Sequence, residues 1–133
     1  MSLKDWRPIG VQVAVIAPNQ ELFMKWIVAD AEGSYLLGMQ EIVNGLIERI
    51  ELTPEIDLWI NEESKVNDLP LNRTVMSPHG NLPIDIVCGV CFLAKHDGEG
   101  GVASITEQEA VAITRARLKG VRFSHLVQLG IEV

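Results

Sequence analysis

Two cysteines three positions apart, in the stretch Ile84–His96 that reads IDIVCGVCFLAKH, have the spacing of a redox dithiol or of half a zinc site. A redox dithiol of the thioredoxin kind needs its first cysteine at a helix N-terminus, which stabilises the thiolate. The apolar residues around Cys88 and Cys91 give no sign of a helix start. Residues three apart on a strand point to opposite faces, so the sulfurs are misdirected for a bridge unless Gly89 bends the chain. We predict two buried strand cysteines, with a metal or redox pair, or a free reactive thiol, as the alternatives.

The remaining soft ligands are three scattered histidines: His79 in a turn, His96 at a strand end and His125 in the tail. None shows the paired spacing of a zinc finger, and a nucleophile triad would need long-range convergence. The glycine-rich segment 98–101 is acidic and has no lysine, so it predicts a solvated loop rather than a phosphate loop. The acidic residues lack calcium-loop spacing. We therefore predict no metal, no cofactor and no catalytic residue.

Four polar residues in and beside the irregular segment 62–81 are the candidates for binding a ligand or partner: Asn61, Asn72, Arg73 and Asp85. Arg73 can offer its planar guanidinium to a carboxylate or phosphate while the two asparagines orient the ligand. Asp85 either joins this site or neutralises Arg73. The interpretation that we favour for this cluster is structural, with these side chains tying loops to backbone groups, and recognition is its rival. If Asp85 and Arg73 form a partly buried pair, removing one partner should cost about 3–5 kcal/mol.

Hydrophobic periodicity and turn chemistry predict the elements that position these residues. Strands are expected at 11–17, 22–28, 46–52, 56–61 and 84–95, the last one broken or bulged at Gly89. One helix is expected from Ser34 to Gly45, and another from the Thr106–Glu109 capping box to Lys119. Segment 62–81 predicts turns with a short helical turn at 71–75, and the tail 121–133 fits a strand or a helix.

This order of elements predicts an α+β fold. We expect a single globular domain over residues 1–133, with a mostly antiparallel sheet of five to six strands packed with two helices. Hairpin-length connections cannot make parallel pairs, which is why the sheet should be antiparallel. Residues 1–10 are expected to be a poorly ordered leader. One sheet edge must be exposed, so a homodimer through that edge is a further expectation.

The balance of acidic and basic side chains limits the classes of molecule that this chain can bind. The chain of 133 residues has 11 basic and 18 acidic side chains, a net charge of -7. Such a chain repels nucleic acid and anionic lipid, so we expect no direct nucleic-acid binding. It contains no apolar run approaching the roughly 20 residues that span a bilayer, and it shows no secretory signal pattern. We therefore expect a cytoplasmic protein with reduced cysteines and no membrane partner.

Four short motifs carry a family resemblance. They are NGLIE at 44–48, the N-E-E-x-K then L-P-x-N-R segment from Asn61 to Arg73, the D-I-x-x-G element from Asp85 to Gly89, and the helix start from Ser104 to Glu109. Through them, residues 40–110 resemble domain of unknown function 3846, a small domain of bacteria, phages and other mobile elements. The resemblance implies fold and genomic context. It does not require Cys88 or Cys91, which favours their structural role.

The function we expect is that of a small cytosolic, non-catalytic accessory domain. It would bind a protein partner in the setting of phage or mobile-element biology. The alternative is a small-ligand-binding or enzymatic domain with its site around Asn61, Asn72, Arg73 and Asp85. A concave pocket holding those four side chains would favour the alternative, and side chains bonded to the backbone would count against it.

Overall fold

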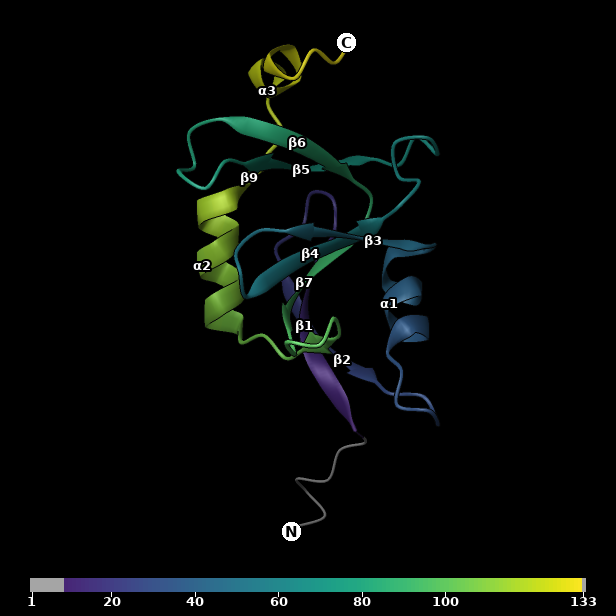
Figure 1. The fold of residues 1–133 in the computed structure, drawn as a ribbon. Coiled ribbons are helices and arrows are strands. Elements are labelled where there is room, and N and C mark those ends of the chain that lie inside the picture. The colour runs from purple at the N-terminus through teal and green to yellow at the C-terminus, as the bar shows by residue number, and fades with distance from the viewer. Residues whose placement is uncertain (1–8, 133) are drawn as a thin grey trace.

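The computed structural model describes residues 9–132, which form nine strands and three helices (Figure 1). Along the chain these are β1 (Gly10–Ile16), β2 (Phe23–Val28), α1 (Leu36–Val43), β3 (Ile47–Glu51), β4 (Ile56–Asn61), β5 (Leu71–Met76), β6 (Pro83–Cys88), β7 (Cys91–His96), β8 (Val102–Ala103), α2 (Glu107–Arg117), β9 (Leu118–Gly120) and α3 (Phe123–Gln128). The predicted leader over residues 1–10 lies outside the described residues except at its end, where Gly10 begins β1.

The larger sheet, sheet A, has the strand order β2-β1-β7-β4-β3, and β8 pairs with the end of β7. All of these pairs are antiparallel, including the two predicted hairpins β1–β2 and β3–β4. The alternation predicted for β4 is confirmed, because Leu58 and Ile60 join one hydrophobic cluster while Trp59 joins another. Asp57 therefore shares the face of Trp59, since side chains two apart on a strand point the same way.

The smaller sheet, sheet B, has the order β6-β5-β9 and is also antiparallel. The helical turn predicted at 71–75 is wrong, because these residues belong to β5. Two register shifts interrupt the β5–β6 pairing, one between Leu71 and Arg73 and one between Val75 and Met76. Such irregularities disturb the two-residue alternation by which a strand is recognised in sequence. Strand β5 is therefore identified by its hydrogen-bonded pairing in the structure and not by its sequence pattern.

Gly89 separates the two sheets. The predicted break at this residue is confirmed, and it is larger than a bulge: β6 lies in sheet B and β7 in sheet A. Gly89 has φ +74, and a Cβ placed on it would lie 2.7 Å from Leu69 Cδ1. Glycine adopts this backbone conformation without the penalty that a side chain brings. The chain thus passes from one sheet to the other at a position where only glycine fits easily.

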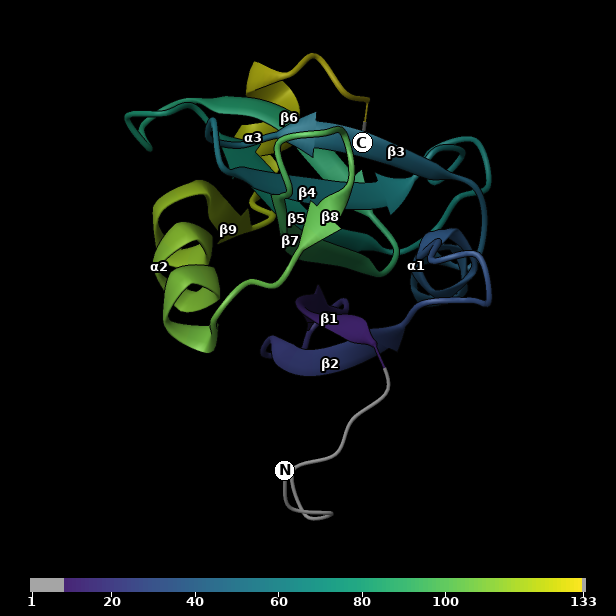
Figure 2. The same ribbon diagram turned by 60° about the horizontal axis from the view of Figure 1, so that its bottom comes forward.

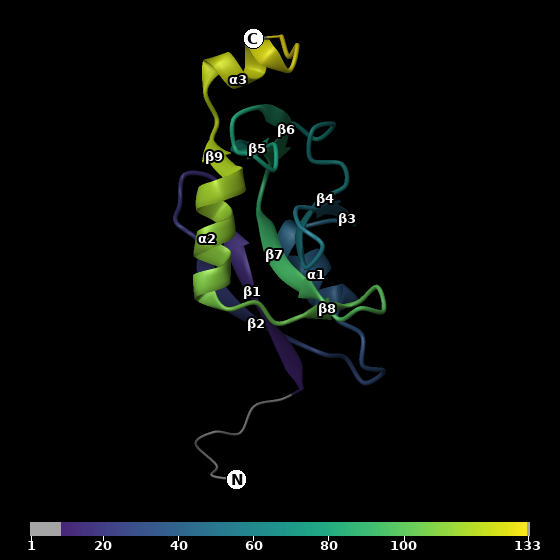
Figure 3. The same cartoon turned by 60° about the vertical axis from the view of Figure 1, so that its left-hand side comes forward.

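Sheet A carries a hydrophobic cluster on each face. The first cluster joins sheet A to sheet B and α2, and includes Leu58, Leu93, Val75, Val87 and Ala110. The second joins sheet A to α1, and includes Val13, Phe92, Met39 and Val43. A small third cluster of Ile86, Cys88 and Leu126 lies between β6 and α3. The views agree with this arrangement, with α1 and α2 on opposite sides of sheet A and α3 over sheet B (Figures 1, 2 and 3).

The helix ends differ from the prediction by a few residues. Helix α1 ends one residue early, because Asn44 rather than Gly45 takes the left-handed conformation. The capping box of Thr106 and Glu109 at the start of α2 is confirmed. Glu109 also accepts a hydrogen bond of 2.9 Å from Lys95, which ties α2 to β7. Helix α2 ends at Arg117, where the chain enters β9 instead of continuing to residue 119.

The α+β class and the antiparallel pairing are confirmed, with sheet A holding the predicted five to six strands. The described residues contain a third helix, α3, so the part of the tail over Phe123–Gln128 is helical rather than a strand. Among residues 9–132 no helix combines the length and apolar character that crossing a membrane demands.

Candidate functional site

Asn61 links the end of β4 to the end of α1. Its side-chain amide donates to the Val43 and Asn44 carbonyls at 3.1 and 3.3 Å, and its side-chain oxygen accepts from the Glu63 amide at 2.8 Å. The neighbouring Gly45 is required by this packing, because a Cβ there would lie 2.6 Å from the Asn61 side-chain nitrogen. The polar atoms of this buried side chain are bonded to the backbone.

Asn72 joins the two sheets. Its amide nitrogen donates to the Ile16 carbonyl at 2.9 Å and to the Gly89 carbonyl at 2.8 Å, and it lies 3.6 Å from Cys91 Sγ. Arg73 donates to the Asn72 side-chain oxygen at 2.9 Å and to the Gln20 carbonyl at 2.8 Å. The structure therefore brings Asn72 and Arg73 together, with each bonded to a carbonyl of another segment.

Asp85 forms its ion pair with Lys65, at 2.6 Å, while Arg73 donates to main-chain and asparagine oxygens. Both members of the Lys65–Asp85 pair are substantially exposed, and exposed pairs contribute only about 0–1 kcal/mol. The four candidates thus divide among three local networks. Their role in binding a ligand or partner stays a prediction.

The two cysteines lie in different sheets, Cys88 at the end of β6 and Cys91 at the start of β7. Both are buried free thiols, as the structural interpretation of the motif predicts. Burial raises the pKa of Cys91 to about 12 and also raises the pKa of Cys88. Thiols whose ionisation is suppressed are poor nucleophiles. Within residues 9–132 there is no cluster of three or more His, Cys, Asp or Glu side chains that could hold a metal ion.

A buried polar group that the sequence analysis did not single out is Asp57, which is 1% exposed. Its Oδ2 lies 3.0 Å from His96 Nδ1 and 3.9 Å from an Arg49 guanidinium nitrogen. Its Oδ1 has no hydrogen-bond partner among the described residues. Burial raises the pKa of Asp57, and His96 and Arg49 oppose that effect. The sequence does contain a signal for this group, because the alternation of residues 56–61 places the Asp57 carboxylate on the same face of the strand as the large apolar Trp59 side chain.

A second feature is the distribution of charge along the chain. Residues 110–131 contain four basic side chains, Arg115, Arg117, Lys119 and Arg122, and no acidic one. The rest of the chain therefore holds the other seven basic residues and all 18 acidic ones. The basic segment comprises most of α2, β9 and α3, which follow one another along one side of the molecule (Figures 1 and 3). The net charge of -7 does not show that residues 110–131 are basic while the rest of the chain is acidic.

Arg117 differs from the other three cations because it is buried. Its guanidinium donates to the Met76 carbonyl at 2.6 Å and to the Leu52 carbonyl at 2.5 Å. Burial lowers the pKa of Arg117. Arg115, Lys119 and Arg122 are exposed, and Lys119 Nζ donates to the Arg115 carbonyl at the end of α2. Three cations are thus available at the surface.

Helix α3 is apolar on two sides. Leu126 packs against Ile86 and Cys88 of sheet B, with Leu129 beside them. Phe123 and Val127, one helical turn apart, remain 68% and 56% exposed. We call Arg115, Lys119, Arg122, Phe123 and Val127 the C-terminal surface. Exposed apolar groups rimmed by polar ones are typical of interaction sites.

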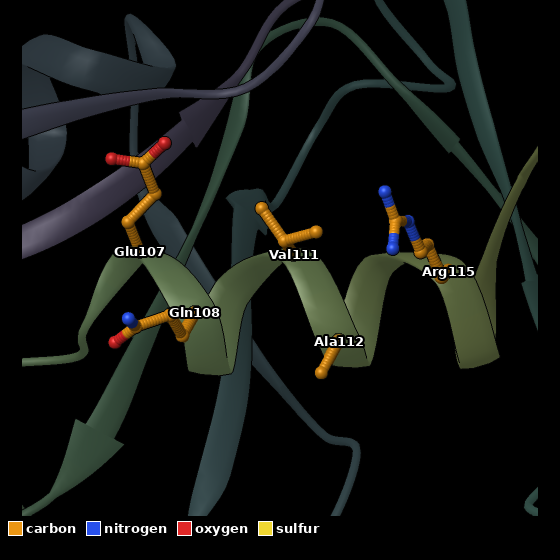
Figure 4. A pocket seen from close by; sticks show the side chains of 5 residues that line it. All are labelled: Glu107, Gln108, Val111, Ala112 and Arg115. Atoms are coloured by element: carbon orange, nitrogen blue, oxygen red, sulfur yellow. The ribbon is translucent and has the colours of Figure 1, made fainter.

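The outer side of α2 adds a shallow hollow of about 730 Å³ next to this surface. Figure 4 shows Glu107, Val111 and Arg115 projecting from one side of α2, with Gln108 and Ala112 on the other. The hollow is therefore formed by the side of one helix and holds few converging polar groups. It resembles a contact surface more than an enclosed ligand site.

Comparison of the chain with curated proteins found no match, and comparison with solved structures found none either. A family model described as Domain of unknown function (DUF3846) matches residues 11–117. The match runs from β1 to the end of α2, so it includes Asn61, Asn72, Arg73 and Asp85 and stops before β9 and α3. Because it spans well over half of the chain, this protein belongs to the DUF3846 family.

Proposed function

We propose that the chain is a non-catalytic accessory domain that binds a protein partner through its C-terminal surface. The observation that carries the proposal is the segregation of charge: an acidic chain has three exposed cations around two exposed apolar side chains. The complementary partner is a protein segment with acidic and apolar side chains. Opposite potentials steer such an encounter, and burial of apolar groups supplies affinity.

Nucleic acid fits this surface less well than a protein segment does. A polyanion would meet the three cations, but it would also approach a molecule with a net charge of -7. The exposed Phe123 and Val127 side chains favour an apolar contact that a phosphate backbone does not provide. We therefore retain the absence of direct nucleic-acid binding as part of the proposal.

Three further parts of the proposal come from the sequence. The phage or mobile-element setting is supported by the family resemblance, and a cytoplasmic location is supported by the two free thiols, which a reducing compartment maintains. Self-association is supported by the exposed sheet edges, which include β2 and β3 in sheet A and β6 and β9 in sheet B. Size-exclusion chromatography with light scattering tests the self-association, which does not require the C-terminal surface.

The partner proposal is tested by affinity capture from a host extract with the full chain and a double variant, Arg122→Gln with Phe123→Ala. The matched control is Lys25→Gln with Phe23→Ala, which removes an exposed cation and a 48% exposed phenylalanine from β2. We expect one protein to be lost by the first variant and kept by the control. Loss of a central aromatic residue typically weakens binding by about 2 kcal/mol or more.

Two outcomes would overturn the proposal. One is equal capture by both variants, which would place the contact elsewhere. The other is capture of nucleic acid by the full chain, if salt releases it more easily from the Arg122→Gln, Phe123→Ala variant than from the full chain and equally easily from the control. That result would make nucleic acid, and not a protein, the ligand of the C-terminal surface. The protein complex should also weaken as ionic strength rises, because the cations are exposed and screened by salt.

A second candidate function is small-ligand binding or catalysis. The specific observation in its favour is the buried Asp57 carboxylate, whose Oδ2 lies 3.0 Å from Nδ1 of the partly exposed His96 and whose Oδ1 has no hydrogen-bond partner among the described residues. Arg49, Glu55 and Lys95 lie around the same open groove. Substituting His96→Gln would test it by removing any bound ligand or activity that the purified protein shows, while His79→Gln would leave it intact.

A further inference from the structure

The outer side of α2 carries a pattern of charges that is its own complement. Glu107, Val111 and Arg115 follow one another at intervals of four residues, so they form one row along the helix (Figure 4). The row has an acid near the start of α2, an apolar side chain in the middle and a base near the end. The neighbouring row contributes the exposed Ala112 beside Val111. Turned end to end, this side of α2 presents each charge to the opposite one.

The two charges of this row form no ion pair within residues 9–132. The acids that form ion pairs in that part of the chain are Asp57, Asp85 and Glu109. Glu107 and Arg115 are both exposed. They cannot pair with each other, because eight residues of helix separate them by about 12 Å along the axis. Both charges are therefore available to a second molecule.

The shallow hollow on this side of α2 suits a helix. All of its lining residues belong to α2, and they come from the row of Glu107, Val111 and Arg115 and from the neighbouring row of Gln108 and Ala112. Side chains four residues apart form ridges on a helix, and the ridge of a second helix packs into the groove between two of them. The short side chains of Val111 and Ala112 at the centre allow a second helix to approach closely.

A second copy of α2 in antiparallel orientation supplies a helix with matching charges. Glu107 and Arg115 each lie four positions from Val111, so a two-fold axis at Val111 places Glu107 of each copy opposite Arg115 of the other. A parallel orientation would place like charges together. The helix macrodipole also favours an acid near the start and a base near the end of any helix. The apolar centre and the lack of ion pairs within residues 9–132 are what point to a second copy.

We propose that two copies of the chain associate through antiparallel α2 helices, with Val111 and Ala112 at the two-fold axis and a Glu107–Arg115 ion pair on each side of it. The contact is confined to a helix of 11 residues, about 16 Å long. It therefore buries less than the roughly 1,200 Å² of a stable interface, and the dimer is weak and reversible. The self-association proposed above then uses α2 and not a sheet edge. Arg115 also belongs to the C-terminal surface, but the dimer does not use Arg122 or Phe123.

The test measures the dimer dissociation constant of the full chain and of charge-reversal variants by sedimentation equilibrium. We expect Glu107→Arg and Arg115→Glu each to weaken the dimer about tenfold, because each replaces two attractive pairs with two repulsive ones. The two substitutions change the net charge of -7 in opposite directions, so overall repulsion cannot explain a loss in both. Glu41→Arg reverses an exposed charge on α1 and is the matched control, which should dimerise like the wild type.

A mixture of the two single variants separates the dimer from an effect on the helix itself. In a pair made of one Glu107→Arg chain and one Arg115→Glu chain, every charge again faces its opposite, so we expect the mixture to associate about as tightly as the wild type. An effect of the macrodipole within each chain would not be relieved by mixing.

Three outcomes would overturn the inference. The first is a wild-type chain that stays monomeric at about 1 mM. The second is a dimer that neither charge reversal weakens, which would place the self-association at a sheet edge. The third is a mixture that associates no better than either variant alone. None of these results bears on the capture of a partner protein, because the Arg122→Gln, Phe123→Ala variant leaves Glu107, Val111 and Arg115 unchanged.

Discussion

At the scale of the residue, the Asn72 side chain fixes a junction between segments that are far apart in sequence. It donates to carbonyls at the end of β1 and at Gly89, and so holds the point where the chain changes sheets. The sequence allows two roles for this residue, in ligand recognition and in tying loops to backbone groups. The hydrogen bonds favour the second, but which carbonyls it meets depends on the long-range pairing of β1 and β7.

Replacing Asn72 with alanine tests that structural role. The substitution removes the amide donor from the Gly89 carbonyl and from the Ile16 carbonyl, which keeps only the weak Cys91 thiol donor at 3.7 Å. A buried unsatisfied group costs about 1–3 kcal/mol. We therefore expect a loss of about 2–5 kcal/mol in the free energy of unfolding, measured by urea denaturation. Lys65→Ala, which breaks an exposed ion pair, serves as the comparison and should cost less than about 1 kcal/mol. Equal losses in both variants would contradict the role given to Asn72.

Asp57 should make stability depend on pH. Burial raises its folded-state pKa above the ordinary value of 3.8, so the folded protein holds this proton to higher pH than the unfolded chain does. The contribution of this group is therefore fully present below about pH 3.8 and is lost as pH rises through the folded-state pKa. Asp57→Asn removes the titration and keeps an oxygen near His96.

The measurement compares the free energies of unfolding of wild type and Asp57→Asn from pH 3.5 to pH 7. We expect wild type to lose stability relative to the variant as the pH rises, in agreement with the sign of the raised pKa. Glu55→Gln, at the rim of the neighbouring groove, provides a control in which an acid is removed without burial. A difference between wild type and Asp57→Asn that grows in the opposite direction would show that the His96 and Arg49 charges dominate.

The two thiols should be inert in the folded protein. Cys91 is fully buried with its pKa raised to about 12, and Cys88 is also buried. Because the thiolate is the reactive form, a disulfide reagent such as DTNB at pH 8 should react with neither thiol within the time of mixing. In denaturant both should react at once. Fast reaction of one equivalent in the native protein would show that Cys88 is accessible and would revive the redox interpretation of the motif.

At the scale of the element, periodicity identified the strands and helices that have one continuous apolar face. The β1–β2 and β3–β4 hairpins and the capping box of α2 were all visible in this way. Strand β5 was missed, because its two register irregularities obscure the alternation. Strand β9 was also missed, since three residues are too few for a periodic pattern and the segment reads as the end of a helix. A local sequence pattern does not predict a strand whose formation depends on pairing with residues that are distant in the sequence.

Gly89 is the element boundary that sequence and structure both identify. Gly89→Ala combines a left-handed backbone with a Cβ that would lie 2.7 Å from Leu69 Cδ1. Backbone strain of this kind costs on the order of 1–3 kcal/mol in either variant, and the contact with Leu69 adds to it only at Gly89, so we expect Gly89→Ala to lose more free energy of unfolding than a variant with strain alone. Gly98→Ala is the matched control, with a similar φ of +85 but open space around the Cβ. If both variants lose the same stability, the contact with Leu69 contributes nothing.

At the scale of the whole molecule, two properties lay beyond the sequence analysis. The strands were predicted as one sheet, whereas they form two, because the choice of partner for each strand depends on contacts across the core. The total charge of -7 was taken as a property of the surface, although the C-terminal segment is basic. The candidate residues were likewise chosen by type and spacing. Neither criterion detects Asp57, whose significance lies in a buried carboxylate oxygen with no hydrogen-bond partner in the part of the chain that the structure describes.

Arg117 connects the layers, since it extends from α2 and donates to Met76 at the end of β5 and to Leu52 beyond the end of β3. Arg117→Ala would leave both buried carbonyls without a donor and remove the packing of the side-chain stem. We expect a loss of about 3–5 kcal/mol in the free energy of unfolding, because each unsatisfied group costs about 1–3 kcal/mol. Native-state hydrogen exchange should show β5 and β6 opening more readily than β1 and β7.

Arg115→Ala is the matched control for this prediction, because Arg115 lies two residues earlier on α2 and is exposed. It should change the free energy of unfolding by less than about 0.5 kcal/mol and leave the exchange of sheet B amides unaltered. Arg117→Met separates packing from hydrogen bonding, since it keeps an apolar stem and removes the donors. If Arg117→Met were as stable as wild type, the two carbonyls would not need the guanidinium, and the hydrophobic cluster and Asn72 would hold the sheets together without it.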